Sequence, residues 1–321
     1  MHLAAMGLGD NPENWNTESI LLSAIHTHDA PGALLIGPLA SAKAHAATLI
    51  PTTNPGAALD LLSQDVTRTL PAGSSAAGEQ PKFLAHNEKG ESFVVKFSAN
   101  RGTPYGDRWS DLLIAEAMAN KVLSDFGYAS ANNEVVQTDT RTYLLSTRFD
   151  RIGQGRRHIV SVGSVHDAFV KNAYVNWFAT CSELARQGRL PLSQAQAVTD
   201  IFRFGQIIGN TDMHSGNLAL YVQGRALQEL LEGKFSVAPV YDMLPMRWRP
   251  DPTLGMQEYA AFDADYSMAP LHIRQAAMVF WLKLSTNHMV SRDLKAVSAQ
   301  MSARMGVDLQ ELPAQMETPR G

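Results

Sequence analysis

The feature that most constrains this chain is a short polar segment enclosed by two apolar runs. Residues 210–217 read NTDMHSGN, and they follow an apolar run that ends at Gly209. A strand-like apolar run, residues 218–221, begins directly after them. Within the segment, Asp212 and Asn217 stand five residues apart. The pattern predicts a functional loop between two buried elements, because such polar residues need a rigid scaffold to act together.

A second carboxylate follows the next strand-like run. Residues 235–241 read FSVAPVY, and this alternating run leads to Asp242 at its end. Phosphoryl-transfer enzymes of the kinase fold need an Asp to accept the proton of the attacking hydroxyl and an Asn five residues later to hold magnesium. A further Asp holds magnesium against the nucleotide phosphates. Asp212, Asn217 and Asp242 have this order and spacing.

Two simpler interpretations apply to single residues of this set. Polar loop residues such as Asp212 are common in plain turns, and Asp212 with His214 could form a metal-binding pair. A turn, however, has no use for an Asp, an Asn five residues later and a strand-borne Asp242. The three positions together therefore favour phosphoryl transfer.

Length and composition set the frame for this chemistry. The chain has 321 residues, enough for two lobes around a cleft, and its 45% hydrophobic and 18% charged residues are typical of a globular protein. A formal net charge of −4 gives no global electrostatic reason to bind nucleic acid. The single cysteine, Cys181, reads as a buried small hydrophobe. Because no run approaches the roughly 20 apolar residues of a membrane span, we expect no membrane contact and a cytoplasmic location.

A run of small residues and a strand lysine precede the polar loop. Residues 72–78 read AGSSAAG, which would let backbone N–H groups approach an anion such as a phosphate. The alternative is a flexible linker, and the spacing is not that of a Walker loop. Lys96 lies inside the β-rich run 91–98, where a kinase carries its phosphate-pairing lysine. Small-residue loop, strand lysine and then a helix is the order of a kinase small lobe.

The helix expected over residues 110–123 carries two acids, Asp111 and Glu116. A kinase pairs its strand lysine with an acid of this helix. Either carboxylate could pair with Lys96, and the sequence does not choose between them.

Periodicity and turn residues place the other elements. Helices are expected over residues 17–25 (capped by Asn16 or Thr17), 57–62, 168–186, 193–208, 270–289 and 291–305. Strands are expected over residues 32–38, 133–138 and 142–147. The second half of the chain is thus mainly helical, and the lobe boundary should fall near Asp150.

Five segments in order resemble the HipA family of bacterial toxin serine/threonine kinases. They are SAAGEQPK at 75–82, VK at 95–96, RFDR at 148–151, GNTDMHSGN at 209–217 and APVYDM at 238–243. The resemblance covers roughly residues 70 to 290. It implies an α+β fold of two lobes like a protein kinase, with a small β-rich N-lobe and a mainly helical C-lobe. Residues 1–70 would be an N-terminal subdomain of uncertain role, residues 71–150 the N-lobe core and residues 151–321 the C-lobe.

The resemblance also implies ATP and Mg²⁺ as cofactors and assigns the site. Asp212 would be the catalytic base, Asn217 and Asp242 the magnesium ligands, and Lys96 the phosphate-binding lysine. Ser75 would be autophosphorylated. Further nucleotide contacts would come from Ser75, Ala76, Ala77, Gly78, Gln80, Lys82, Thr147, Arg148, Phe149 and His214, with residues 147–149 facing the adenine.

For partners, the resemblance implies a protein substrate such as an aminoacyl-tRNA synthetase and a small DNA-binding antitoxin. This chain departs from the family pattern in two ways: only about 70 residues precede the phosphate loop, and Gly73 stands where short members carry a first serine. The target and the regulation known for the family therefore cannot be carried over to this chain. The Asp-x-His-x-x-Asn pattern of residues 212–217 is also similar to small-molecule kinases acting on aminoglycosides or choline. A weakly active regulatory partner in a DNA-bound complex is the other alternative, although Lys96, Asp212, Asn217 and Asp242 are all intact.

Overall fold

The computed structural model describes most of the chain. The described residues are 14–26, 29–38, 48–69, 80–153, 155–224, 227–251 and 255–305. The small-residue loop expected over 72–78 therefore lies outside them. Among the helices of the described ranges, none has the length and apolar character needed to cross a membrane.

A five-stranded sheet forms the first half of the molecule, with strand order β1-β2-β3-β5-β4. The strands are β1 (Thr48–Ile50), β2 (Lys82–Asn87), β3 (Ser92–Phe97), β4 (Asn133–Gln137) and β5 (Thr142–Thr147). β1 runs parallel to β2, and the other neighbours are antiparallel. Alternate residues of β3 are buried, because successive side chains of a strand point to opposite faces and one of these faces packs against the core under helix α3 (Gly56–Thr69). The expected strands at 91–98, 133–138 and 142–147 are confirmed, whereas β2 was not predicted.

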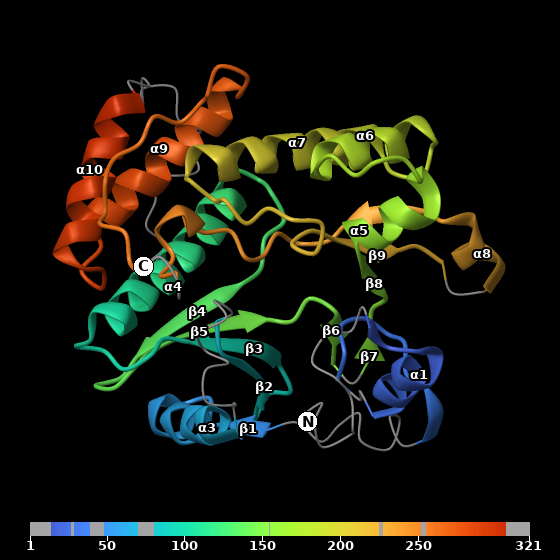
Figure 1. Ribbon diagram of the computed structural model, residues 1–321, viewed down its shortest axis with the longest axis horizontal. Coiled ribbons are helices and arrows are strands. Elements are labelled where there is room, and N and C mark those ends of the chain that lie inside the picture. Colours follow the sequence, from blue (N-terminus) through green and yellow to red (C-terminus); the bar gives the residue numbers. More distant parts are fainter. Residues whose placement is uncertain are drawn as a thin grey trace.

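Helices cover the two faces of this sheet (Figure 1). Helix α3 lies against one face, where Leu59, Val95 and Tyr143 are fully buried. Helix α4 (Pro104–Asp125) lies on the other face, between the sheet and the helices of the second half. α4 begins at Pro104 because Thr103 accepts a hydrogen bond from the Gly106 N–H.

The second half of the molecule is mainly helical. Its longer helices are α6 (Trp177–Arg186), α7 (Leu192–Ile207), α9 (Leu271–Thr286) and α10 (Arg292–Met305). Its shorter elements are β6 (Arg151–Ile152), β7 (Gly155–Arg156), β8 (Ile159–Ser161), α5 (Val162–Val165), the π-helix η4 (His166–Val170), β9 (Ala219–Val222), α8 (Leu227–Glu232), β10 (Phe235–Val237) and the 3₁₀-helix η5 (Met246–Trp248). Strands β10, β9 and β8 form a small antiparallel sheet.

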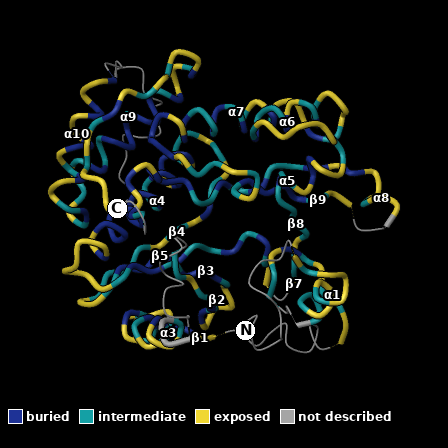
Figure 2. The backbone as a smooth tube through the Cα atoms, in the orientation of Figure 1, coloured by how far each residue is buried: buried dark blue, intermediate teal, exposed yellow. Residues whose placement is uncertain are grey.

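Large buried side chains hold the helical half together, and Figure 2 shows buried residues along both α7 and α9. Phe204 of α7 meets Phe280 of α9 edge to face, and Trp281 packs against Trp248. Cys181 is fully buried in the same core, and burial raises the pKa of its thiol to about 12. Cys181 is therefore the inert hydrophobe expected from the sequence. The rigid end of α7 carries the polar loop.

Several predicted elements need correction. Residues 32–36 form bends and irregular backbone rather than a strand, and residues 37–38 are helical. The Gly32 N–H donates to the Asp150 carboxylate instead of to a neighbouring strand. The helix expected over 168–186 is broken: η4 ends at Val170, Lys171 follows it with φ 64°, and α6 begins only after Asn176, which caps it. The helix expected over 57–62 extends to Thr69.

The N-terminal helix α1 (Thr17–His26) is confirmed, and Asn16 is its cap, because its side chain accepts a hydrogen bond from the Ser19 N–H at 2.8 Å. Helices α7, α9 and α10 are also confirmed within a few residues. Asp242 does not end a strand, since β10 stops at Val237 and Val240 makes only an isolated bridge to Ser130.

Candidate active site

Lys96 of β3 reaches across to α4 and binds Glu116. The Lys96 Nζ donates to both carboxylate oxygens of Glu116, at 2.6 and 2.7 Å. Lys96 shares a sheet face with its cross-strand partners, Leu144 of β5 and Lys82 of β2. The neighbouring Val95 points the other way, into the core beneath α3. Glu116 is only 1% exposed. The structure thus chooses between the two acids left open by the sequence.

Asp111 has a different role. Its carboxylate accepts hydrogen bonds from the Ser291 N–H at 2.7 Å and from the Tyr259 hydroxyl at 2.9 Å. Ser291 in turn precedes α10, so Asp111 anchors α4 to the helical half. Five residues of helix separate Asp111 from Glu116, which turns the two side chains about 140° apart.

Asp242 approaches Lys96 from the opposite side. Its carboxylate forms an ion pair with the Lys96 ammonium. Burial alone would lower the pKa of Lys96, but the carboxylates of Asp242 and Glu116 outweigh it and raise this pKa. Burial would raise the pKa of Asp242, and the charge of Lys96 lowers it instead. Both groups are therefore ionised at neutral pH.

The backbone of Asp242 lies in the left-handed region, with φ 52°. Non-glycine residues occupy this region infrequently, and Asp and Asn are among the side chains that tolerate it. Such strained residues persist where the surrounding structure holds them, and they cluster at functional sites.

Hydrogen bonds within the polar loop hold Asp212 and Asn217 together. The Asn217 side-chain amide donates to the Asp212 carbonyl at 2.7 Å, and the Asn217 N–H donates to the His214 carbonyl at 3.0 Å. The indole N–H of Trp177 also donates to that carbonyl, at 2.7 Å. The His214 ring accepts from the Gly216 N–H at 3.0 Å, which turns the imidazole back onto its own loop.

These residues line one cavity of about 370 Å³. Its lining consists of Gln80, Lys82, Lys96, Trp109, Glu116, Asp212, His214, Asn217, Asp242, Leu244, Met246 and Arg249. Seven of the residues expected from the sequence thus meet here: Gln80, Lys82, Lys96, Asp212, His214, Asn217 and Asp242. Trp109, Leu244 and Met246 form an apolar wall that sequence reasoning did not predict.

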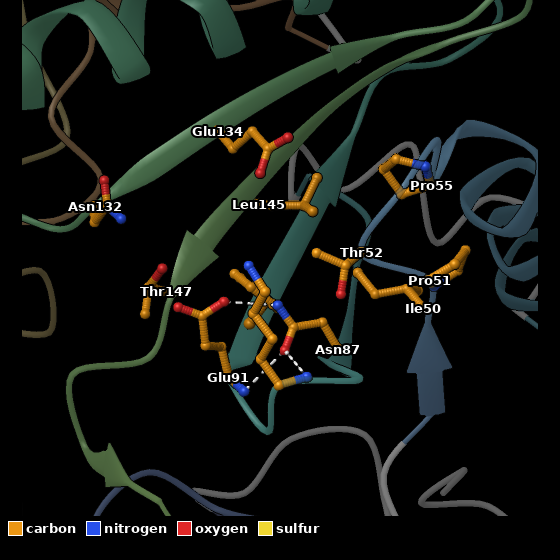
Figure 3. Close-up of a pocket in the computed structure, with 12 residues that line it drawn as sticks. Ile50, Pro51, Thr52, Pro55, Asn87, Glu91, Asn132, Glu134, Leu145 and Thr147 are labelled. Atoms are coloured by element: carbon orange, nitrogen blue, oxygen red, sulfur yellow. Dashed lines mark hydrogen bonds between the residues drawn. The ribbon is translucent and has the colours of Figure 1, made fainter.

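The remaining expected site residues lie elsewhere or outside the described part of the chain. Ser75, Ala76, Ala77 and Gly78 belong to residues 71–79, which the structure does not describe. Thr147 pairs with Phe93, on the sheet face opposite Lys96. It lines a second cavity of about 170 Å³ together with Asn87 and Glu134 (Figure 3).

Arg148 and Phe149 are engaged in packing where the sheet meets the helical half. The Arg148 guanidinium, 5% exposed, binds Asp150 at 2.9 Å and Asp29 at 2.7 Å. Phe149 packs against Tyr221 and Tyr241. The side chain of Arg148 is thus directed into a buried ionic network.

This network joins the N-terminal segment to the strand that leaves the sheet. Arg151 bridges Asp29 and Asp150 at 2.7 Å each, and its guanidinium also donates to the Ala30 and Gly32 carbonyls. We refer to Asp29, Arg148, Asp150 and Arg151 as the hinge network. Sequence reasoning missed it, because Asp29 lies more than a hundred residues from its partners.

The donor set of the cleft fits a magnesium ion held together with a phosphate-bearing ligand. Magnesium takes oxygen ligands, and it is usually bound through one or two carboxylates plus substrate phosphates. The Asp242 carboxylate and the Asn217 side-chain oxygen are donors of this kind. Among the described residues no three His, Cys, Asp or Glu side chains gather into a metal cage. Lys96 adds the cation that phosphates require.

Comparisons with known proteins agree with this architecture. The family model of the HipA-like C-terminal domain matches residues 74–306. Toxin YjjJ of Escherichia coli (strain K12) is 35% identical over 244 residues, which make up 73% of this chain and 53% of that protein. The chain therefore spans about half the length of this curated relative.

A solved structure of the toxin–antitoxin system HipA of Shewanella oneidensis MR-1, with HipB and its operator DNA, is also similar. The TM-score is 0.60 at 18% identity, over 94% of this chain and 80% of that one. At 18% identity, this structural similarity establishes the fold of the chain and nothing more. The fold is α+β and two-lobed, like a protein kinase, as the sequence predicted.

Proposed function

Because this chain belongs to the family of the HipA-like C-terminal domain, we propose that it is a toxin kinase that transfers phosphate from ATP, with Mg²⁺, to a serine or threonine of another protein. The observation that carries the proposal is the convergence of Lys96, Glu116, Asp212, Asn217 and Asp242 on one cavity. A kinase needs these side chains, in these roles, to position and neutralise phosphates.

The nucleotide would lie between the sheet and the polar loop. Lys96, oriented by Glu116, would bind its phosphates, while Asp242 and Asn217 would hold the metal through their side-chain oxygens. Bound magnesium would supply the charge that stabilises the phosphates during transfer. Gln80 and Lys82 line the same cavity and would contact the nucleotide from β2 and the residues before it.

Asp212 would accept the proton of the attacking hydroxyl. Its loop is held by Asn217 and by the Trp177 bond to the His214 carbonyl, so its position does not depend on the substrate. A fixed carboxylate beside the attacking oxygen aligns the hydroxyl with the phosphorus and removes its proton during transfer.

The relatives guide the choice of acceptor and partner. The name Toxin YjjJ supports a toxin role, and the HipA structure with HipB and operator DNA supports a small DNA-binding antitoxin as partner. We propose a protein acceptor such as an aminoacyl-tRNA synthetase.

Purified chain should be incubated with labelled ATP and Mg²⁺ and, in separate reactions, with a bacterial lysate, purified synthetases, choline and an aminoglycoside. Label on a protein supports the proposal, whereas label only on a small alcohol overturns it.

Magnesium-dependent nucleotide binding is the first expected result. Titration calorimetry should show ATP binding in the presence of Mg²⁺ and much weaker binding after chelation with EDTA, because Asp242 and Asn217 act on the nucleotide through the metal. In the presence of Mg²⁺, Lys96→Met should bind ATP more weakly than the unsubstituted protein, since it removes the cation that would contact the phosphates. Equal affinity with and without Mg²⁺ would contradict the assignment of the two ligands.

Phosphorylation of Ser75 is the second expected result. The serine lies in a small-residue segment expected to face the ATP phosphates, so a phosphate of about −1.5 to −2 charge would repel the nucleotide and lower its affinity. Incubated alone with ATP, the active chain should become phosphorylated on Ser75 and Asp212→Ala should not. Mixed with active chain, Asp212→Ala should become phosphorylated, which identifies transfer between copies.

Phosphopeptide mapping distinguishes the outcomes, with Ser75→Ala as the control for the neighbouring Ser74. Phosphate on Ser75 of the Asp212→Ala variant incubated alone, or no phosphate on Ser75 of the active chain after long incubation, would rule the modification out.

A further inference from the structure

We propose that Asn210 is a positioning residue that couples the catalytic base to the metal-holding carboxylate. The inference rests on the proposed function for the roles of Asp212 and Asp242. The coupling itself rests on the contacts of Asn210, which joins the segments that carry those two residues.

The Asn210 side chain is buried, with 5% of the residue exposed, and both ends of its amide are used. The Oδ1 accepts the Asp212 N–H at 3.0 Å, and the Nδ2 donates to the Asp242 carbonyl at 3.3 Å. One planar group therefore spans two segments that lie 32 residues apart in the sequence.

The backbone around Asn210 gives it a fixed base. The Asn210 N–H donates to the Gly205 carbonyl at 2.8 Å, which ties the residue to the end of α7. The Arg247 N–H donates to the Gly209 carbonyl at 3.0 Å, a second bond between the same two segments. Gly209 has φ 77°, and a Cβ there would lie 2.8 Å from the Phe262 ring, so this turn requires glycine.

Only an uncharged amide serves both contacts. Aspartate at this position would keep the acceptor for Asp212 but lose the donor and place a negative charge beside the Asp242 carbonyl. Alanine would lose both bonds and leave the Asp242 carbonyl without this donor. Because Asp242 has the left-handed φ of 52°, its backbone needs such support to keep the carboxylate directed into the cleft.

Asn210 therefore sets where the base stands relative to the metal ligand. Phosphoryl transfer depends on that spacing, since the attacking oxygen at Asp212 and the phosphates at Asp242 must align. A shift of the order of 1 Å in such a geometry costs about 10²-fold in rate.

Asn210→Ala and Asn210→Asp test the coupling, with Asn87→Ala as a matched control. Asn87 is similarly buried, at 7% exposed, and its Oδ1 also accepts backbone N–H groups, from Lys89 and Glu91 at 3.0 Å each. It is the last residue of β2, just before the turn to β3, and it lines the second cavity (Figure 3). Both alanine variants lose hydrogen bonds of a buried amide, and only one touches the cleft.

The first measurement is the initial rate of label transfer from ATP to the lysate acceptor as a function of Mg²⁺. Asn210→Ala should lose about 10²-fold in rate at saturating Mg²⁺ and should need several-fold more Mg²⁺ for half-maximal rate. Asn210→Asp keeps the bond to Asp212, so it should recover part of the rate while keeping the raised Mg²⁺ requirement. Asn87→Ala should retain the rate of the unsubstituted protein within about threefold, even where its melting temperature falls as much as that of Asn210→Ala.

Hydrogen exchange measured by mass spectrometry tests the coupling without any activity. In Asn210→Ala, peptides containing Asp212 and peptides containing residues 242–247 should both exchange faster, whereas in Asn87→Ala they should match the unsubstituted protein. Where Asn210→Ala fails to fold, Asn210→Asp should still speed exchange at residues 242–247.

The outcomes separate the inference from the proposed function. Unchanged rate, Mg²⁺ dependence and exchange in Asn210→Ala would overturn the coupling. Absence of any transfer by the unsubstituted chain would overturn the proposed function instead, and the exchange experiment would still decide whether Asn210 holds the two segments together.

Discussion

Replacing Asp212 or Asp242 by alanine should lower phosphoryl transfer by about 10³-fold or more. Asp212→Ala removes the proposed catalytic base, which would align and deprotonate the attacking hydroxyl. Asp242→Ala removes the proposed metal ligand, which would hold the metal against the phosphates. Neither change should unfold the protein, because Lys96 keeps Glu116 as a partner when Asp242 is lost.

Asp242→Asn separates chemistry from backbone strain. Asparagine tolerates the left-handed φ of 52° that alanine tolerates poorly, so this variant keeps the backbone while weakening the metal ligand. It should be almost as inactive as Asp242→Ala. Asp263→Ala, at a carboxylate that is 99% exposed, is the matched control and should retain full activity.

The measurement is label transfer from ATP to protein, with circular dichroism to check the fold of each variant. Growth of cells that overexpress the active chain offers a second readout: where the active chain slows growth, both inactive variants should be harmless. Near-normal transfer by Asp212→Ala or by Asp242→Asn would show that the roles are wrongly assigned.

Loss of Arg148 should strongly destabilise the fold. Arg148→Ala should lower the free energy of unfolding by about 3 kcal/mol, because it removes the buried guanidinium that binds Asp150 and leaves this carboxylate with fewer donors, Arg151 and the Gly32 N–H. Arg148 and Asp150 have side chains that are 5% and 6% exposed, so water cannot replace the lost contacts. Arg148 also binds Asp29, which ties the N-terminal segment to this point.

Urea denaturation measures this loss, with Arg186→Ala as the matched control. Arg186 forms an ion pair with Glu183 at 2.6 Å, but its side chain is 75% exposed. Exposed pairs contribute about 0 to 1 kcal/mol, so this control should be nearly neutral. An equally small effect of Arg148→Ala would show that the hinge network does not stabilise the protein.

The pH dependence gives the hinge network a second signature. Burial by itself would raise the pKa of Asp150, but hydrogen bonds and charge from Arg148 outweigh it and hold this pKa below its usual value. The stabilisation is therefore complete above the unfolded-state pKa of about 3.9 and is lost as the pH falls through the lower folded value. The stability difference between the unsubstituted protein and Arg148→Ala should shrink below about pH 4.

The spacing of Asp212 and Asn217 could be interpreted from the sequence because both lie in one short loop. Local sequence sets the distance between residues five positions apart, and the apolar runs on either side identify the scaffold. The same reasoning located most of the helices and strands, since their periodicity is a local property. The prediction failed at residues 168–176, because the expected continuous helix is interrupted at Lys171, whose backbone is left-handed.

The choice between Asp111 and Glu116 needed the tertiary structure. Both acids suit the strand lysine chemically, and only the packing of α4 shows that Glu116 faces Lys96 while Asp111 faces Ser291. Thr147 is a similar case: its sheet face follows from pairing with Phe93. Register and helix rotation are decided by contacts between segments distant in the sequence.

The sequence by itself determined the order of the kinase-like segments and the chemical identity of Lys96, Asp212, Asn217 and Asp242, because these depend on residue type and short-range spacing. Tertiary structure alone decided which acid supports Lys96, that Asn210 joins the polar loop to Asp242, and that Asp29 completes the hinge network. The physical reason is that hydrogen bonds and buried ion pairs act over about 3 Å. The separation of two residues in the sequence does not tell whether folding brings them this close.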